Sequence, residues 1–202
     1  MKEKIILKSA NPQEYGDLVI ECRVIENDQI GKYLESIPEE RKFVAYKSGS
    51  VEARQGIPGE IIKTVLKTEV DGKEYILSEE DNEVKERDGE VDIVVTNISS
   101  TSNEQYVVKR KKFLETYSLP EEATEENRFG LGWVPVYDPR VLTQIDENII
   151  IITAWGSKAV CLKGGYIVTY NAEENDYNTL EKGAGNSTYK RDSQSTKQKK
   201  RN

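Results

Sequence analysis

The chain contains no histidine and only two cysteines among its 202 residues. Without histidine, no Ser-His or Cys-His catalytic relay can form, and zinc sites with histidine ligands are excluded. Cys22 and Cys161 lie far apart in apolar surroundings, so we expect two buried free thiols rather than a disulfide or a nucleophile. We therefore expect no metal or cofactor, and acid–base catalysis would depend on Asp, Glu, Lys or Tyr.

Long hydrophobic runs are also missing. No apolar stretch approaches the ~18 residues of a membrane span, and the N-terminus lacks the apolar core of a signal peptide. We therefore expect a cytoplasmic protein that does not bind membranes. Hydrophobic residues make up 36% of the chain and charged residues 32%, which permits a small core in each of two modules. The net charge of −7 disfavours non-specific binding to phosphates.

Alternation of hydrophobic and polar residues predicts strands near the N-terminus. Two short strands are expected within residues 1–26, and the second of them, DLVIECRVI, alternates most clearly. Apolar residues at helical spacing predict a short helix over Asp28–Arg41, ended by Pro38. Phe43–Gln55 is predicted to be a pair of strands broken at Ser48–Ser50.

Turn signals organise the middle of the chain. Asp71-Gly72 between β-forming residues predicts a hairpin with strands at about Ile61–Glu69 and Lys73–Leu77. The densely charged segment Ser78–Glu90 is predicted to be a solvated loop. Ile145–Ala154 contains four consecutive isoleucines, which predict a strand buried on both faces.

Two stretches, Asp92–Tyr117 and Tyr166–Tyr189, share one pattern. Each begins with an apolar run that ends in Thr and Asn, continues through a polar loop to a Tyr, and closes with a Thr-Tyr pair. The pattern suggests that one folding unit was duplicated.

The first of these stretches predicts a strand, a partner strand at Gln105–Lys109 and a helix over Arg110–Tyr117. The apolar side of that helix is expected to carry Phe113, Leu114 and Tyr117. The second stretch has Gly183 and Gly185 in the corresponding segment, and because glycine destabilises helices we expect a looser ending there.

These patterns predict an α+β fold that is mainly β. It should contain two small β-rich modules, each closed by a short helix or helical turn, and an N-terminal strand-rich segment. The predicted boundaries are 1–58 for the N-terminal segment, 59–118 for the first module, 119–128 for an acidic linker, 129–189 for the second module and 190–202 for a disordered basic tail.

The first stretch has an apolar strand ending in Thr, a Glu-x-Tyr-x-Val segment and a Lys-Phe-Leu-x-x-Tyr ending, which place Glu104, Tyr106, Phe113 and Tyr117. This pattern resembles the small bacterial PGDYG domain, named for its Pro-Gly-Asp-Tyr-Gly motif. The second stretch is similar in a more diverged form, through its Gly-Gly-Tyr-Ile-Val-Thr segment and its Thr-Tyr pair.

The named motif itself is replaced in both copies, by Asp88–Asp92 and by Lys163–Tyr166. The resemblance covers about Gly59–Tyr117 and Ile145–Tyr189, roughly half of the chain. It implies a small β-rich domain with a closing helix, and it implies no established reaction or ligand.

Tyrosine is unusually common, with eleven Tyr against three Phe. Tyr suits surfaces that are partly apolar and partly wet, as binding faces are. The candidates for binding a ligand or partner are Tyr106, Trp133, Trp155, Tyr166 and Tyr177. Trp133 is the strongest of them, because it lies between Gly and Pro rather than in a predicted strand. The alternative for each Tyr is a core position with its hydroxyl at the rim.

Two basic segments are candidates for phosphate contact. Their residues are Lys109, Arg110, Lys111 and Lys112, and in the tail Lys197, Lys199, Lys200 and Arg201. The alternatives are a solvated helix face and a solubilising terminus. Two acidic runs, Glu79–Glu90 and Glu121–Glu126, could meet a basic partner or mimic a phosphate backbone; the alternatives are a solvated loop and a linker.

The sequence favours a non-enzymatic protein-interaction module of bacterial or phage origin, because it offers no recognisable catalytic constellation and segregates its charges. A more specific form of this hypothesis is an inhibitor of a basic nucleic-acid-binding protein. One alternative is a domain that binds a nucleotide or small molecule, or an enzyme that uses Asp, Glu and Tyr. Another is nucleic-acid binding through the basic tail.

Overall fold

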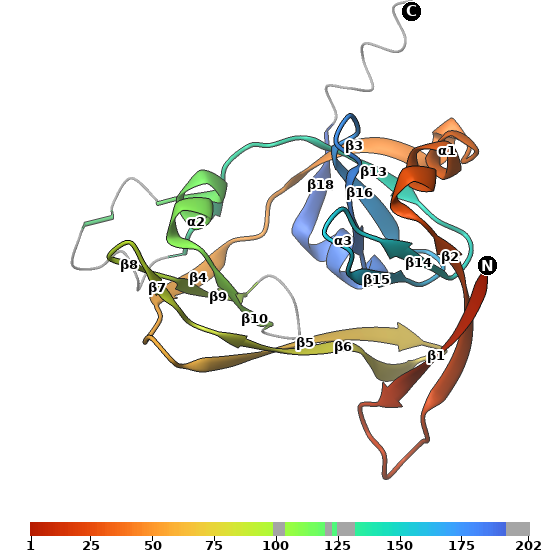
Figure 1. Cartoon of the computed structure of the whole chain (residues 1–202), viewed down its shortest axis with the longest axis horizontal. Helices are drawn as coiled ribbons and strands as arrows, with labels where there is room; N and C mark the ends of the chain where they lie inside the picture. The colour runs from red at the N-terminus through yellow and green to blue at the C-terminus, as the bar shows by residue number, and fades with distance from the viewer. Residues whose placement is uncertain (99–103, 120–122, 125–131, 193–202) are drawn as a thin grey trace, which may run out of the picture. The chain divides into compact units, whose positions relative to one another are not determined.

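A computed structural model describes residues 1–98, 104–119, 123–124 and 132–192 (Figure 1). The fold is mainly β with a few short helices, which confirms the predicted fold class. The chain divides into two compact units. The first unit contains Met1–Tyr46, Thr68–Tyr75 and the chain from Asp138 onward, and the second contains Lys47–Lys67 and Ile76–Tyr137.

Neither unit is continuous in sequence, whereas the sequence suggested contiguous modules with boundaries after residues 58, 118 and 128. Pairing between distant strands is the reason for the difference. Strand β2 (Leu18–Ile25) runs parallel to β14 (Ile149–Ile152), and β3 (Lys42–Lys47) pairs with β13 (Arg140–Gln144). These pairings place Met1–Tyr46 and the chain from Asp138 onward in one unit.

Within the described residues, the first unit holds two sheets, two α-helices and two short 3-10 turns. A five-stranded sheet has the order β17-β16-β13-β3-β18, and β1, β2, β14 and β15 belong to a six-stranded sheet that continues into β6 and β5. The other elements of this unit are β1 (Lys2–Ser9), β15 (Lys158–Cys161), β16 (Tyr166–Asn171), β17 (Asp176–Leu180), β18 (Tyr189–Arg191), α1 (Ile30–Glu35) and α3 (Lys182–Thr188).

Two apolar clusters fill the first unit. One packs α1 against β14 and one face of β16, through residues that include Ile30, Ile149 and Ile167. The other lies on the opposite face of the five-stranded sheet and includes Leu142 and Tyr166. The isoleucines Ile149–Ile151 are fully buried, as the sequence predicts.

The second unit holds a sheet of order β10-β9-β4 and a short two-stranded ribbon, β11-β12. Val51 of β4 also pairs with Trp133, the residue before β12, through two backbone hydrogen bonds of 3.0 and 2.8 Å. The elements are β4 (Val51–Gln55), β7 (Glu86–Arg87), β8 (Glu90–Val91), β9 (Ile93–Asn97), β10 (Gln105–Val108), α2 (Arg110–Thr116), β11 (Tyr117–Ser118) and β12 (Val134–Pro135).

Both units contain an antiparallel hairpin, then a seven-residue helix, then a short strand. These are β9-β10-α2-β11 and β16-β17-α3-β18. Val108, which lies two residues before α2, is the cross-strand partner of Ile93. Leu180, which lies two residues before α3, is the cross-strand partner of Tyr166. Ile93 and Tyr166 therefore occupy matching positions in the two hairpins.

The hairpin predicted at Asp71-Gly72 joins β5 (Ile61–Val70) to β6 (Lys73–Glu83). Both turn residues have positive φ, 52° and 75°, which is the signature of a type I′ turn. The predicted solvated loop at Ser78–Glu90 is wrong, because β6 continues to Glu83 and β7-β8 forms a further hairpin. Strands exposed on one face tolerate the charged residues that suggested a loop.

One other local prediction needs correction. Strands β3 and β4 form where expected but do not pair with each other, because β3 lies between β13 and β18 while β4 pairs with β9. After β17 the chain forms the helix α3, which has the same length as α2 despite its glycines.

The remaining differences concern the ends of elements. Phe113 and Tyr117 are buried as expected, but Leu114 is exposed. The helix predicted over Asp28–Arg41 is limited to α1 and short 3-10 turns on either side. Lys190 lies in β18 rather than in a tail. Most of the predicted linker and residues 193–202 of the tail lie outside the described residues.

None of the helices in the described part of the chain has the length and apolar character needed to span a membrane.

Candidate functional site

A tight turn joins β4 to β5 in the second unit, at Gly56–Glu60. The amide of Glu60 donates to the carbonyl of Ile57 at 2.9 Å, and Gly59 has a φ of 85°. Proline at the first central position and a glycine of positive φ at the second define a type II turn. Pro58 and Gly59 therefore set the direction in which the chain reverses.

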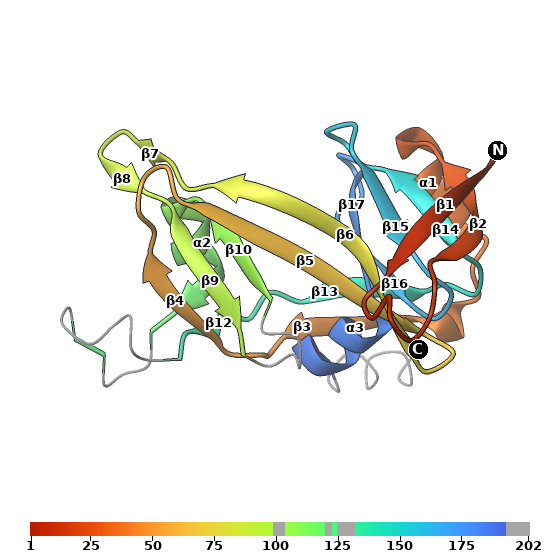
Figure 2. The ribbon, with the colours of Figure 1, turned by 90° about the horizontal axis from the view of Figure 1, so that it is seen from below.

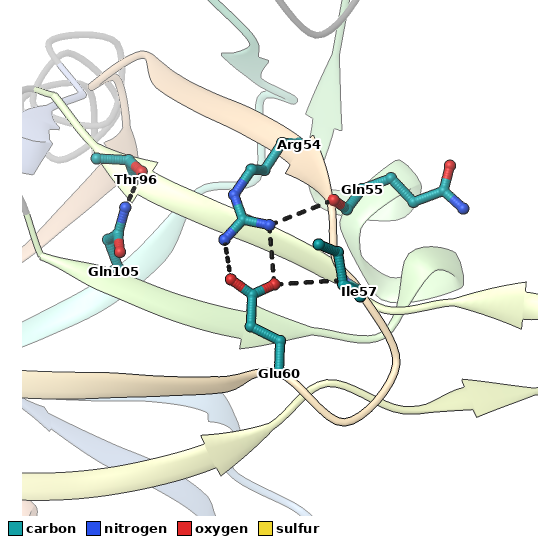
Figure 3. A network of polar contacts seen from close by, with 6 residues as sticks. All are labelled: Arg54, Gln55, Ile57, Glu60, Thr96 and Gln105. Carbon is teal, nitrogen blue, oxygen red and sulfur yellow. Dashed lines mark hydrogen bonds and ion pairs between the residues drawn. The ribbon is translucent and has the colours of Figure 1, made fainter.

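A bidentate ion pair holds this turn from one side (Figure 3). The guanidinium of Arg54 donates to both carboxylate oxygens of Glu60, at 2.9 and 2.5 Å. The amide of Ile57 donates to the same carboxylate at 3.3 Å. The hydrogen bond from Arg54 lowers the pKa of Glu60, so the carboxylate and the clamp persist to a lower pH than an ordinary glutamate would allow.

The other side of the turn is tied to the end of β6 and the start of β9. All three hydrogen bonds are between backbone groups. The amide of Gly59 donates to the carbonyl of Val84 at 2.9 Å, and the amide of Val84 donates to the carbonyl of Glu60 at 2.8 Å. The amide of Gly56 donates to the carbonyl of Asp92 at 3.0 Å. A Cβ at Gly56 would lie 2.5 Å from a methyl group of the buried Val84. The turn is thus anchored both through its backbone and through close packing beneath it.

Two isoleucines face solvent, one within this turn and one at the start of β5. The exposed fraction is 67% for Ile57 and 57% for Ile61. Single exposed aliphatic residues are common, but these two lie on backbone that is held by several hydrogen bonds, so binding would remove little further backbone entropy. We define Ile57 and Ile61 with their supporting turn as the isoleucine turn.

The β7-β8 hairpin lies beside the isoleucine turn in both views (Figure 2). Its tip, Asp88-Gly89, has φ values of 53° and 77°, again those of a type I′ turn. The buried carboxylate of Asp92 holds its base, accepting the amide of Lys85 at 3.0 Å and the guanidinium of Arg87 at 2.7 Å. This hairpin and the isoleucine turn therefore share one hydrogen-bonded support.

A second polar cluster in the same unit surrounds the buried Tyr117. The ammonium of Lys47 donates to its hydroxyl at 2.5 Å, and the hydroxyls of Tyr106 and Tyr117 lie 2.9 Å apart. Burial raises the pKa of the Glu104 carboxyl, and the positive charge of Lys47 opposes that rise. The cluster combines an ammonium group, two phenols and a carboxyl group whose pKa lies above its ordinary value.

Among the residues singled out from the sequence, Trp133, Tyr166 and Tyr177 are buried. Trp133 packs edge-on against Phe113 with ring centroids 4.6 Å apart. It lies in the core because β4 binds its backbone and turns the indole inward, so it offers no surface to a partner.

Tyr106 is half-buried, whereas Trp155 is 61% exposed in the turn before β15. Tyr106 packs against the apolar cluster that contains Trp133 in the second unit, whereas Trp155, Tyr166 and Tyr177 belong to the first unit.

The first basic segment lies at the start of α2. Lys109, Lys111 and Lys112 are exposed and Arg110 is half-buried. The tail residues Lys197, Lys199, Lys200 and Arg201 lie outside the described residues, so nucleic-acid binding through the tail stays a prediction.

The sequence indicated a turn at Gly56–Gly59 but no sequence pattern there indicated that Ile57 and Ile61 are exposed. The sequence pattern of isoleucines around a Pro-Gly pair is the same whether the isoleucines are buried or exposed in the fold. Exposure depends on which strands cover the turn, and those strands come from distant parts of the chain.

Comparison with known proteins finds no family model, no curated protein and no solved structure that matches this chain.

Proposed function

We propose that the protein is a non-enzymatic protein-interaction module of bacterial or phage origin, built from two diverged copies of one PGDYG-like β-rich unit. The observation that carries the interaction role is the isoleucine turn: two exposed aliphatic side chains on a backbone clamped from both sides.

The shared order of elements supports the duplication. Each copy has the same hairpin, helix and strand, and the tyrosine of each Thr-Tyr pair, Tyr117 or Tyr189, opens the strand after the helix. Phe113 and Gly185 are both fourth in their helices, and each donates its amide to the residue before the helix, at 2.9 and 2.8 Å.

The support beneath the isoleucine turn favours binding over a purely structural role. A turn that only connected two strands would need neither a bidentate ion pair nor exposed isoleucines. Burying an isoleucine side chain at an interface contributes about 1.5–3 kcal/mol, and a rigid turn loses little of that to ordering.

Capture from a lysate of cells that express the protein tests this role. The immobilised full-length chain is compared with the Ile57→Ser/Ile61→Ser variant. The matched control is Ile6→Ser/Val19→Ser, a cross-strand pair on β1-β2 with exposed fractions of 66% and 60%.

We expect a protein that the wild type and the control retain and the turn variant loses, with equal unfolding temperatures for all three chains. Identical capture by all three, or loss only in the Ile6/Val19 control, would reject the isoleucine turn as the binding surface.

The cluster of Lys47, Glu104, Tyr106 and Tyr117 favours a second candidate function, the binding or turnover of a small molecule. Two phenol groups and a carboxyl of raised pKa beside an ammonium group offer several polar contacts to a small polar ligand. A thermal-shift screen with nucleotides and common metabolites tests it. A shift that Tyr106→Phe and Lys47→Met abolish would support a ligand site, and no shift with any compound would reject it.

A further inference from the structure

The hairpin beside the isoleucine turn carries a marked excess of acidic residues. Between Glu79 and Asp92 the sequence has eight acidic residues (79, 80, 81, 83, 86, 88, 90 and 92) and two basic ones (85 and 87), a net charge of −6. All of Glu86–Glu90 is exposed. The hairpin that carries this charge lies beside the isoleucine turn (Figures 1 and 2), so a single partner can reach both features.

Several of these carboxylates already have partners and several do not. Glu79 pairs with Lys63, Glu83 with Lys85 and Asp92 with Arg87. In the part of the chain that the structure describes, no hydrogen bond or ion pair engages the side chains of Glu86, Asp88 and Glu90. We call these three the acidic tip.

We infer that the isoleucine turn and the acidic tip form one docking surface for a basic protein. An apolar depression on that partner takes the two isoleucines, and Lys or Arg side chains of the partner surround the depression. This inference rests on the proposed function and names the partner's chemistry. Interfaces place an apolar centre inside a charged rim, and complementary charge sets the partner and the association rate.

The same charges argue against other occupants. Nucleic acids and anionic lipid surfaces are negatively charged, as the acidic tip is, and would be repelled by it. A second copy of this chain carries a net charge of −7 and would bring like charges together. A basic protein is the occupant whose charge complements this surface.

A random 12-residue peptide library displayed on phage supplies a defined probe. Selection uses the immobilised full-length chain at about 50 mM salt, where exposed charges are weakly screened. Selected peptides are then titrated against the wild type, Ile57→Ser/Ile61→Ser and Glu86→Gln/Asp88→Asn/Glu90→Gln. Asn tolerates the positive φ of Asp88, so the second variant removes charge and keeps the turn.

We expect the selected peptides to be basic with a large apolar or aromatic residue. Their Kd should rise roughly tenfold or more in each variant, because the first loses the burial of two aliphatic side chains and the second loses up to three charge pairs. Binding should also weaken as salt increases. The Ile6→Ser/Val19→Ser control should bind as the wild type does.

Peptides that need both isoleucines but are uncharged, and that bind the acidic-tip variant unchanged, would overturn the inference and leave the proposed interaction role standing. Peptides that bind all variants equally would contradict both. Acidic peptides, or a self-association lost in Ile57→Ser/Ile61→Ser, would also overturn the inference, because they would replace the basic partner with another occupant.

Discussion

Replacing Gly185 with alanine tests whether packing or local helix preference decides the structure of α3. A Cβ at this position would lie 2.5 and 2.7 Å from two ring carbons of Tyr166. Carbon atoms in contact are normally about 3.5–4.0 Å apart, so the methyl group would overlap the ring by about 1 Å. The ring cannot move aside easily, because it packs against Phe43 and its hydroxyl donates to Asn186 at 3.2 Å.

Two opposing terms set the expected magnitude. Overpacking of this severity costs about 3 kcal/mol, the upper end of its usual range. Exchanging glycine for alanine within a helix returns about 1 kcal/mol. We therefore expect Gly185→Ala to lower the free energy of unfolding by about 2 kcal/mol, which corresponds to a fall of about 4–8 °C in Tm for a chain of this size.

Scanning calorimetry of four variants completes the test. In the Tyr166→Ile background the clash is absent, so Gly185→Ala should become neutral or stabilising, with a coupling of about 3 kcal/mol. This background imitates the second unit, which has Ile93 on the strand and Phe113 on the helix. Gly183→Ala is the control, because its Cβ would meet only the flexible carboxylate of Glu181. A rise in Tm for Gly185→Ala alone would refute the reasoning, because helix preference would then outweigh the packing.

Three further predictions concern the core and the cluster around Tyr117. Trp133→Ala should lower stability by about 3–5 kcal/mol in urea unfolding, whereas the exposed Trp155→Ala should change it by less than about 0.5 kcal/mol; similar effects would contradict the core assignment of Trp133. Burial raises the pKa of the Cys22 thiol and raises that of Cys161 to about 12. Neither thiol should therefore react with a thiol reagent at pH 8 until the chain is denatured. Rapid labelling of the native protein would count against this burial. The folded state raises the pKa of Glu104 above 4.5. The protonated carboxyl therefore stabilises the fold fully below that pH, and this stabilisation is lost as the pH rises through the raised pKa. Glu104→Gln should raise Tm at pH 7 but not at pH 4, and equal shifts in Tm at both pH values would exclude this titration.

Several elements follow from short-range patterns. The hairpin at Asp71-Gly72 needs only two residues that accept positive φ, and the alternation in β2 needs only one buried face. Three of the four isoleucines in β14 are fully buried, because consecutive aliphatic side chains point to both faces of a strand and favour a strand covered on both faces. In each case the information lies within about ten residues.

Strand partners could not be found in the same way. Nothing between Phe43 and Gln55 indicates that β3 pairs with β13 and β18, about one hundred residues or more away, rather than with the neighbouring β4. Backbone hydrogen bonds are the same in any pairing, so the choice depends on which side chains pack well across the sheet.

The sequence by itself determined the mainly β class, the two similar stretches and the buried free thiols, because periodicity, turn residues and residue chemistry act locally. The tertiary structure alone decided that Trp133 is a core residue, that Gly185 makes room for the ring of Tyr166, and that Ile57 and Ile61 face solvent beside an acidic hairpin. Each of these depends on what a distant segment places next to the residue, and side-chain burial is a property of that neighbourhood rather than of the residue itself.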